Sequence, residues 1–71
     1  MREWLRQARL DRSLTQAETA EAVGIAQISY SNIENGARRP SPELAQRLGA
    51  VLGFRWTRFF EDEPGFEQTT N

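Results

Sequence analysis

The chain has 71 residues, no cysteine, no histidine, a net charge of −1 and a pI near 5.3. A chain of this length forms one domain that buries only about 60% of the surface its unfolded form exposes. The missing cysteines exclude disulfides, thiol catalysis and zinc–thiolate sites, and the missing histidines remove the commonest general base and metal ligand. We therefore expect no enzyme activity, no cofactor and no metal site.

The charge is distributed unevenly along the chain. All nine basic residues are arginine; residues 1–40 hold six of them against five acids, and residues 41–71 hold three against five. The acidity thus belongs mainly to the carboxyl-terminal part, and the net charge does not exclude a nucleic-acid partner. No apolar run approaches the roughly 20 residues of a membrane span, and the first ten residues lack the apolar core of a signal peptide. We expect a soluble, cytoplasmic protein with no membrane association.

Capping signals mark the first two helices. Residues 2–12 are rich in helix formers and predict the first one. Thr15, followed three residues later by Glu18, predicts a capping box at the start of the second, with Leu14 placed as a hydrophobic staple. Gly24 is the residue typical of a left-handed helix end. The positions expected to face inward are Thr19, Ala20 and Val23.

Three further helices are expected after Gly24. Residues 27–35 predict a third helix that stops at Gly36, so that helices two and three form a helix-turn-helix unit. Ser41 before Pro42 is a strong start for a fourth helix that runs to Leu52. A short fifth helix is expected at 57–62. The predicted domain covers residues 1–62, and residues 63–71 are expected to form a flexible tail.

The segment AQISYSNIENG, residues 26–36, does not alternate as a strand would, and helical geometry divides it into two faces. Tyr30 and Ile33 share one face, which favours Tyr30 as a core residue. The opposite face carries amide and hydroxyl groups instead of the usual charges, at a cost in helix propensity. Such a face is consistent either with a neutral surface or with recognition of base edges, where Gln and Asn can pair with adenine.

Several short motifs together resemble the phage-repressor and Cro-like helix-turn-helix regulators, the XRE family. The resemblance covers about residues 2–62. The matching residues, in chain order, are Leu14-Thr15-Gln16, Ala20, Val23-Gly24-Ile25, Ile33-Glu34-Asn35-Gly36, Arg39-Pro40-Ser41 and Leu52-Gly53. It implies an all-α, compact, five-helix lambda-repressor-like domain with the helix-turn-helix at helices two and three.

The resemblance also implies a function and its residues. The protein would be a sequence-specific, nucleoid-associated transcription regulator, expected to be a repressor, that binds double-stranded DNA as a homodimer on a palindromic operator. The base contacts implied are Gln27, Ile28, Ser31 and Asn32. The phosphate contacts implied are Gln16, Asn35, Arg38 and Arg39. Arg9 and Glu34 match a structural ion pair.

Three residues depart from the family pattern. Ala26 stands where a Ser or Thr usually caps the third helix, a loss worth about 1 kcal/mol. Ser13 replaces a common glycine at the end of the first helix, and Thr19 replaces a larger aliphatic residue.

An alternative function is an antitoxin-like module that neutralises a protein partner and autoregulates. It is motivated by the acidic carboxyl end and by an aromatic group that could close the core, form the dimer contact or bind another protein. That group comprises Phe54, Trp56, Phe59 and Phe60.

Overall fold

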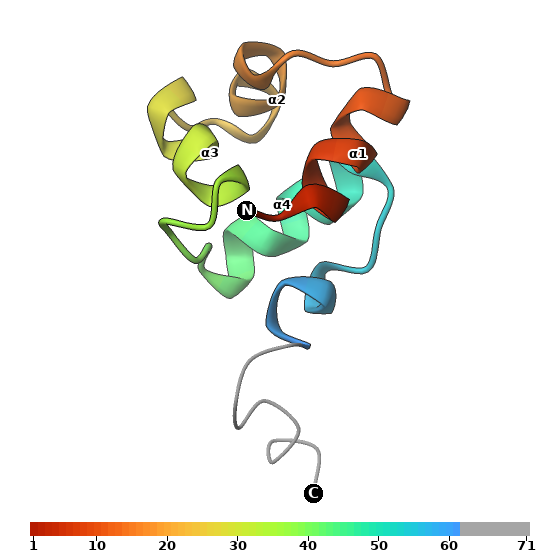
Figure 1. The fold of residues 1–71 in the computed structure, drawn as a ribbon, viewed down its shortest axis with the longest axis vertical. Helices are drawn as coiled ribbons and strands as arrows, with labels where there is room; N and C mark the ends of the chain where they lie inside the picture. The colour runs from red at the N-terminus through yellow and green to blue at the C-terminus, as the bar shows by residue number, and fades with distance from the viewer. Residues whose placement is uncertain (62–71) are drawn as a thin grey trace, which may run out of the picture.

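Five helical segments make up residues 1–61, the part of the chain that this computed structural model describes (Figure 1). Four are α-helices: α1 (Glu3–Asp11), α2 (Gln16–Val23), α3 (Gln27–Glu34) and α4 (Pro42–Leu52). The fifth, η1 (Trp56–Phe60), is a 3₁₀ helix. Within these residues there is no strand. The all-α class, with the helix-turn-helix formed by α2 and α3, is confirmed, while the tail predicted at 63–71 lies outside the described residues.

The capping residues of α2 and α4 act as their sequence signals predicted. The hydroxyl of Thr15 accepts a hydrogen bond from the amide of Glu18 at 3.0 Å, and the Glu18 carboxylate accepts one from the Thr15 amide at 2.9 Å. Gly24 ends α2 in the left-handed conformation with φ of 79°. The Ser41 hydroxyl accepts from the Leu44 amide at 3.2 Å at the start of α4. Local chemistry therefore fixes both ends of the helix that precedes α3.

The two departures next to the helix-turn-helix have visible consequences. Ala26 occupies the cap position of α3 and provides no side-chain hydrogen bond to its first turn. Ser13 follows α1 with φ of 58°, the left-handed region in which a residue with a Cβ is strained. The chain thus holds a strained connection between α1 and α2 and an uncapped α3.

The fifth segment differs in bounds from the short fifth helix expected at 57–62. It begins one residue earlier, at Trp56, and its backbone bonds have 3₁₀ spacing, as in the Arg58 amide donating to the Arg55 carbonyl at 3.0 Å. A segment of five residues is too short to sustain an α-helix by itself, and tertiary packing sets its geometry. Here both Phe59 and Phe60 turn into the core.

A single hydrophobic cluster joins all the elements. The helix α2 packs against α3 and α4, α1 packs against α3, and η1 packs against α4. At one end the ring of Trp4 meets those of Phe54 and Phe59 edge to face, with centroids 5.0 and 5.1 Å away. The buried apolar residues are Leu5, Ala20, Val23, Tyr30, Ile33, Ala45, Leu48, Leu52, Phe59 and Phe60. This core holds α3 by one face and leaves its other face at the surface.

Candidate nucleic-acid interface

The two faces of α3 differ sharply in burial and chemistry. Tyr30 and Ile33 are fully buried, whereas Gln27 is exposed and Ile28 is 68% exposed. Ser31 and Asn32 lie between these extremes, half-buried beside the exposed residues. The only charged residue of α3 is Glu34, which is 1% exposed. The accessible surface of α3 is therefore uncharged, and it carries amide, hydroxyl and aliphatic groups.

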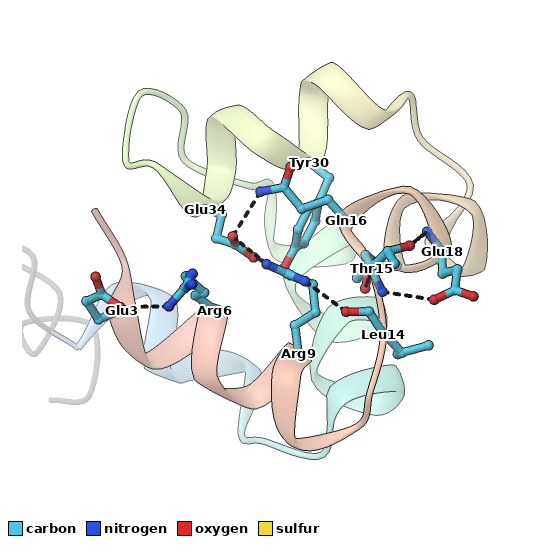
Figure 2. A network of polar contacts seen from close by, with 10 residues as sticks. Glu3, Arg6, Arg9, Leu14, Thr15, Gln16, Glu18, Tyr30 and Glu34 are labelled. Atoms are coloured by element: carbon cyan, nitrogen blue, oxygen red, sulfur yellow. Dashed lines mark hydrogen bonds and ion pairs between the residues drawn. The ribbon is translucent and has the colours of Figure 1, made fainter.

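Figure 2 shows the polar network that anchors α3, centred on the Glu34 carboxylate. Arg9 of α1 reaches it with two nitrogens, Nε at 2.8 Å and Nη2 at 3.1 Å. The Tyr30 hydroxyl donates to it at 2.7 Å and the Gln16 amide at 2.9 Å. Arg9 also donates through Nη1 to the Leu14 carbonyl at 2.8 Å, in the turn between α1 and α2. One carboxylate thus ties α1, α2 and the end of α3 together.

The environment of this carboxylate favours its charged form. Burial alone would raise the pKa of Glu34, but the hydrogen bonds from Arg9, Tyr30 and Gln16 outweigh it and lower that pKa below its usual value. The hydrogen bond to Glu34 raises the pKa of Arg9 in turn. Burial, reinforced by the bond to the carboxylate, also raises the pKa of the Tyr30 hydroxyl. The network is a fully satisfied ion pair at neutral pH, since no buried side-chain polar atom among residues 1–61 lacks a partner.

Gln16, a phosphate contact implied by the family resemblance, lies at the first position of α2. Its Nε2 donates to Glu34, and the side chain is half-buried. A primary amide nitrogen carries two N–H groups, so one remains for an acceptor outside the domain. Gln16 is therefore placed between the anchor of α3 and the surface.

The loop after α3 brings the remaining phosphate candidates together. Asn35, Arg38 and Arg39 are all exposed. The Asn35 side chain accepts a hydrogen bond from the Ala37 amide at 2.9 Å, and the Arg38 amide donates to the Asn32 carbonyl at 3.1 Å. The guanidinium of Arg39 lies 6.0 Å from the centre of the Phe60 ring. These bonds fold the loop back on the carboxyl end of α3.

Arg2 is a residue of this region that the sequence did not single out. Its amide donates to the Glu34 carbonyl at 2.8 Å. Its guanidinium donates through Nη1 to the carbonyls of Ile33 at 2.6 Å and Arg38 at 3.0 Å. Arg2 thus caps the last turn of α3 and holds the loop that carries Arg38 and Arg39, the arginine loop. No local pattern could have indicated this, because the partners lie more than thirty positions apart.

The aromatic group proposed for partner contact divides in two. Phe59 and Phe60 are buried in the domain's own core, at 4% and 8% exposure. Phe54 and Trp56 are half-buried, and their rings meet those of Trp4 and Phe60 at 5.0 and 6.1 Å between centroids. In the described part of the chain there is no cluster of three or more potential metal ligands, nor any helix long and apolar enough to cross a membrane.

Comparison with known proteins agrees with this geometry. The helix-turn-helix family pattern matches residues 5–59. A protein of Bacillus subtilis strain 168, named as the uncharacterized HTH-type transcriptional regulator YqaF, is 48% identical over 62 residues, which cover 87% of this chain and 82% of that relative. An uncharacterized HTH-type transcriptional regulator of Methanothermobacter thermautotrophicus is 40% identical over 53 residues, which cover 75% of this chain and 77% of that relative. No solved structure matched the chain. The chain belongs to the helix-turn-helix family, in the XRE group that its sequence motifs indicated.

Proposed function

We propose that the protein is a sequence-specific regulator of transcription that inserts α3 into the major groove of duplex DNA. The observation that carries this proposal is the uncharged exposed face of α3, whose single acid is buried and neutralised by Arg9. A carboxylate on that face would be repelled by the phosphates that line the groove. Amide side chains can instead bond base edges, with Gln27 and Asn32 suited to adenine and Ser31 suited to several bases.

Phosphate contacts would set the position of α3 on the duplex. The candidates gather at the carboxyl end of α3. The Gln16 side chain donates to Glu34, the last residue of that helix. Asn35, Arg38 and Arg39 follow Glu34 in the loop. Such contacts fix register without reading sequence, and they make binding salt-dependent because counterions are released. Both named relatives are described as transcriptional regulators, which supports the same role here.

The proposal extends to a dimer that represses by occupying a two-fold operator. A single α3 of eight residues reads only a few base pairs, so a pair of half-sites would supply the specificity a regulator needs. Phe54 and Trp56 are the half-buried members of the aromatic group, and we assign them to contact with a second copy. An aromatic group mostly engaged inside its own domain does not favour the antitoxin-like alternative.

Selection from a random duplex library with the purified protein tests the proposal. We expect a palindrome with half-sites about one helical turn apart, and sedimentation of the complex with the mass of two chains. Asn32→Ala should weaken the selected site by about 1–3 kcal/mol and relax specificity at one position per half-site. Failure to enrich any duplex at low salt would refute the function, and enrichment by a single chain would refute the dimer.

A variant that removes one charge distinguishes phosphate contacts, which position α3, from base contacts, which read the sequence. Arg38→Ala should weaken all duplexes similarly and reduce the slope of log K against log salt by about 1 per chain. Arg55→Ala is the matched control, because it removes the same charge just before η1, which packs on α4. Equal salt slopes for the two variants would exclude Arg38 from the interface.

A further inference from the structure

Ile28 is the one aliphatic side chain on the accessible face of α3. It lies at the second position of the helix and is 68% exposed, beside exposed Gln27. The other large apolar residues exposed within residues 1–61 are Met1 and Leu10, and neither lies on α3. The domain therefore presents a single aliphatic group where α3 would meet a base edge.

An exposed isoleucine is an unfavourable choice for a surface helix. Its β-branch lowers helix propensity, and its exposed methyl groups gain no free energy from burial. The same branch restricts χ1 in a helix to essentially one rotamer. Ile28 thus carries its methyl groups in a fixed position and loses little side-chain freedom when they are covered.

The chemistry of the groove limits what can cover this side chain. Guanine, adenine and cytosine present hydrogen-bonding groups along their major-groove edges, while thymine adds a C5-methyl group. The isoleucine side chain can neither donate nor accept a hydrogen bond. Against a polar base edge or a phosphate it would displace water from polar groups without replacing the lost hydrogen bonds. A C5-methyl group is the apolar surface that it can cover without this penalty.

We infer that Ile28 reads the 5-methyl group of a pyrimidine in each half-site, an inference that rests on the DNA-binding function proposed above. Thymine carries this group in ordinary DNA, and 5-methylcytosine carries the same group at the same ring position. Binding would then respond to cytosine methylation wherever a C·G pair occupies that position. The site would distinguish a methylated from an unmethylated duplex of identical sequence.

The test uses variants of the selected operator that each lack one C5-methyl group. Each thymine is replaced in turn by deoxyuridine, which removes the methyl group and keeps every hydrogen-bonding group. Fluorescence anisotropy then gives the Kd for the full chain and for Ile28→Ala. At one position per half-site, deoxyuridine should weaken wild-type binding about fourfold, the equivalent of the roughly 0.8 kcal/mol for one buried methyl-sized group. Ile28→Ala should bind both duplexes with nearly equal Kd.

A second pair of duplexes tests the methylation response directly. With cytosine at that position, 5-methylcytosine should bind wild type about fourfold more tightly than cytosine, and Ile28→Ala should not distinguish them. Leu10→Ala, which shortens an exposed aliphatic residue on α1, is the matched control and should keep the full methyl preference.

The outcomes separate this inference from the proposed function. A protein that enriches a duplex but shows no deoxyuridine effect dependent on Ile28 would overturn the inference and leave the function intact. A methyl preference that Ile28→Ala retains would also overturn it. Failure to enrich any duplex would overturn both.

Discussion

Replacing Glu34 with alanine should destabilise the domain more than any surface change. The carboxylate accepts four hydrogen bonds, two of them from Arg9, whose side chain is only 10% exposed. Its loss leaves the buried charge of Arg9 without a counter-ion and the Tyr30 hydroxyl without its acceptor. Removing one member of a buried ion pair costs about 3–5 kcal/mol. A domain of this length has a total stability of only about 4–11 kcal/mol, so Glu34→Ala should lose from about a quarter to all of it.

Urea unfolding followed by far-UV circular dichroism and tryptophan fluorescence measures this loss. The midpoint should fall while the slope m stays unchanged, because the surface exposed on unfolding is the same. The exposed pair between Glu3 and Arg6, 3.9 Å apart, provides the control. Arg6→Ala should change stability by less than about 0.5 kcal/mol.

A double-mutant cycle decides whether the pair itself is responsible. Arg9→Met and Glu34→Leu should each be destabilising, because each leaves a buried partner behind. The double variant should lose about 1–3 kcal/mol less free energy of unfolding than the two single variants lose in sum. Effects that add to within about 0.5 kcal/mol would refute the assignment of this stability to the ion pair.

Three further predictions concern pH and backbone geometry. The pKa of Glu34 is lower in the folded protein than in the unfolded chain, so the unfolded state binds more protons in acid. The free energy of unfolding should therefore fall as the pH drops below about 4.3. In a plot of urea midpoint against pH, Glu34→Gln should flatten this acid limb. Gly49→Ala would place a Cβ 2.6 Å from the Phe54 carbonyl oxygen, so it should lower the free energy of unfolding by about 1–2 kcal/mol despite alanine's better helix propensity, and an unchanged midpoint would contradict that clash. Ser13→Gly should relieve the strain at φ of 58° and raise stability by about 0.5–1 kcal/mol, whereas Gly24→Ala should lower it by about 1–2 kcal/mol; like signs for the two variants would contradict the backbone argument.

The parts of the fold that the sequence predicted are those set by neighbouring residues. The boundaries of α2 follow from Thr15, Glu18 and Gly24, which interact within a turn of their own helix ends. The start of α4 follows from Ser41 and Pro42 in the same way. Helical periodicity was enough to assign Tyr30 and Ile33 to the core, because an eight-residue helix has only one face to bury.

The rest depends on contacts between distant residues. The 3₁₀ geometry of η1 reflects how Phe59 and Phe60 pack, which no pattern within five residues specifies. The hydrogen bond from Gln16 to Glu34 could not be predicted from the sequence for the same reason. It determines how many N–H groups of the Gln16 side-chain amide are available to an acceptor outside the domain. The residues implied as DNA contacts stay predictions, because the sequence supplied them and a binding measurement must test them.

The contact between Arg2 and the end of α3 has a practical consequence for handling the protein. It draws the start of the chain alongside the loop after α3, and the Met1 backbone lies near Gly36 (Figure 1). Anything joined ahead of Met1, such as an affinity tag or a fluorophore, would emerge beside the arginine loop. A cationic tag there would add affinity for any polyanion, and a bulky one would obstruct the approach of a duplex. Assays of this protein should use chains from which such extensions have been cleaved.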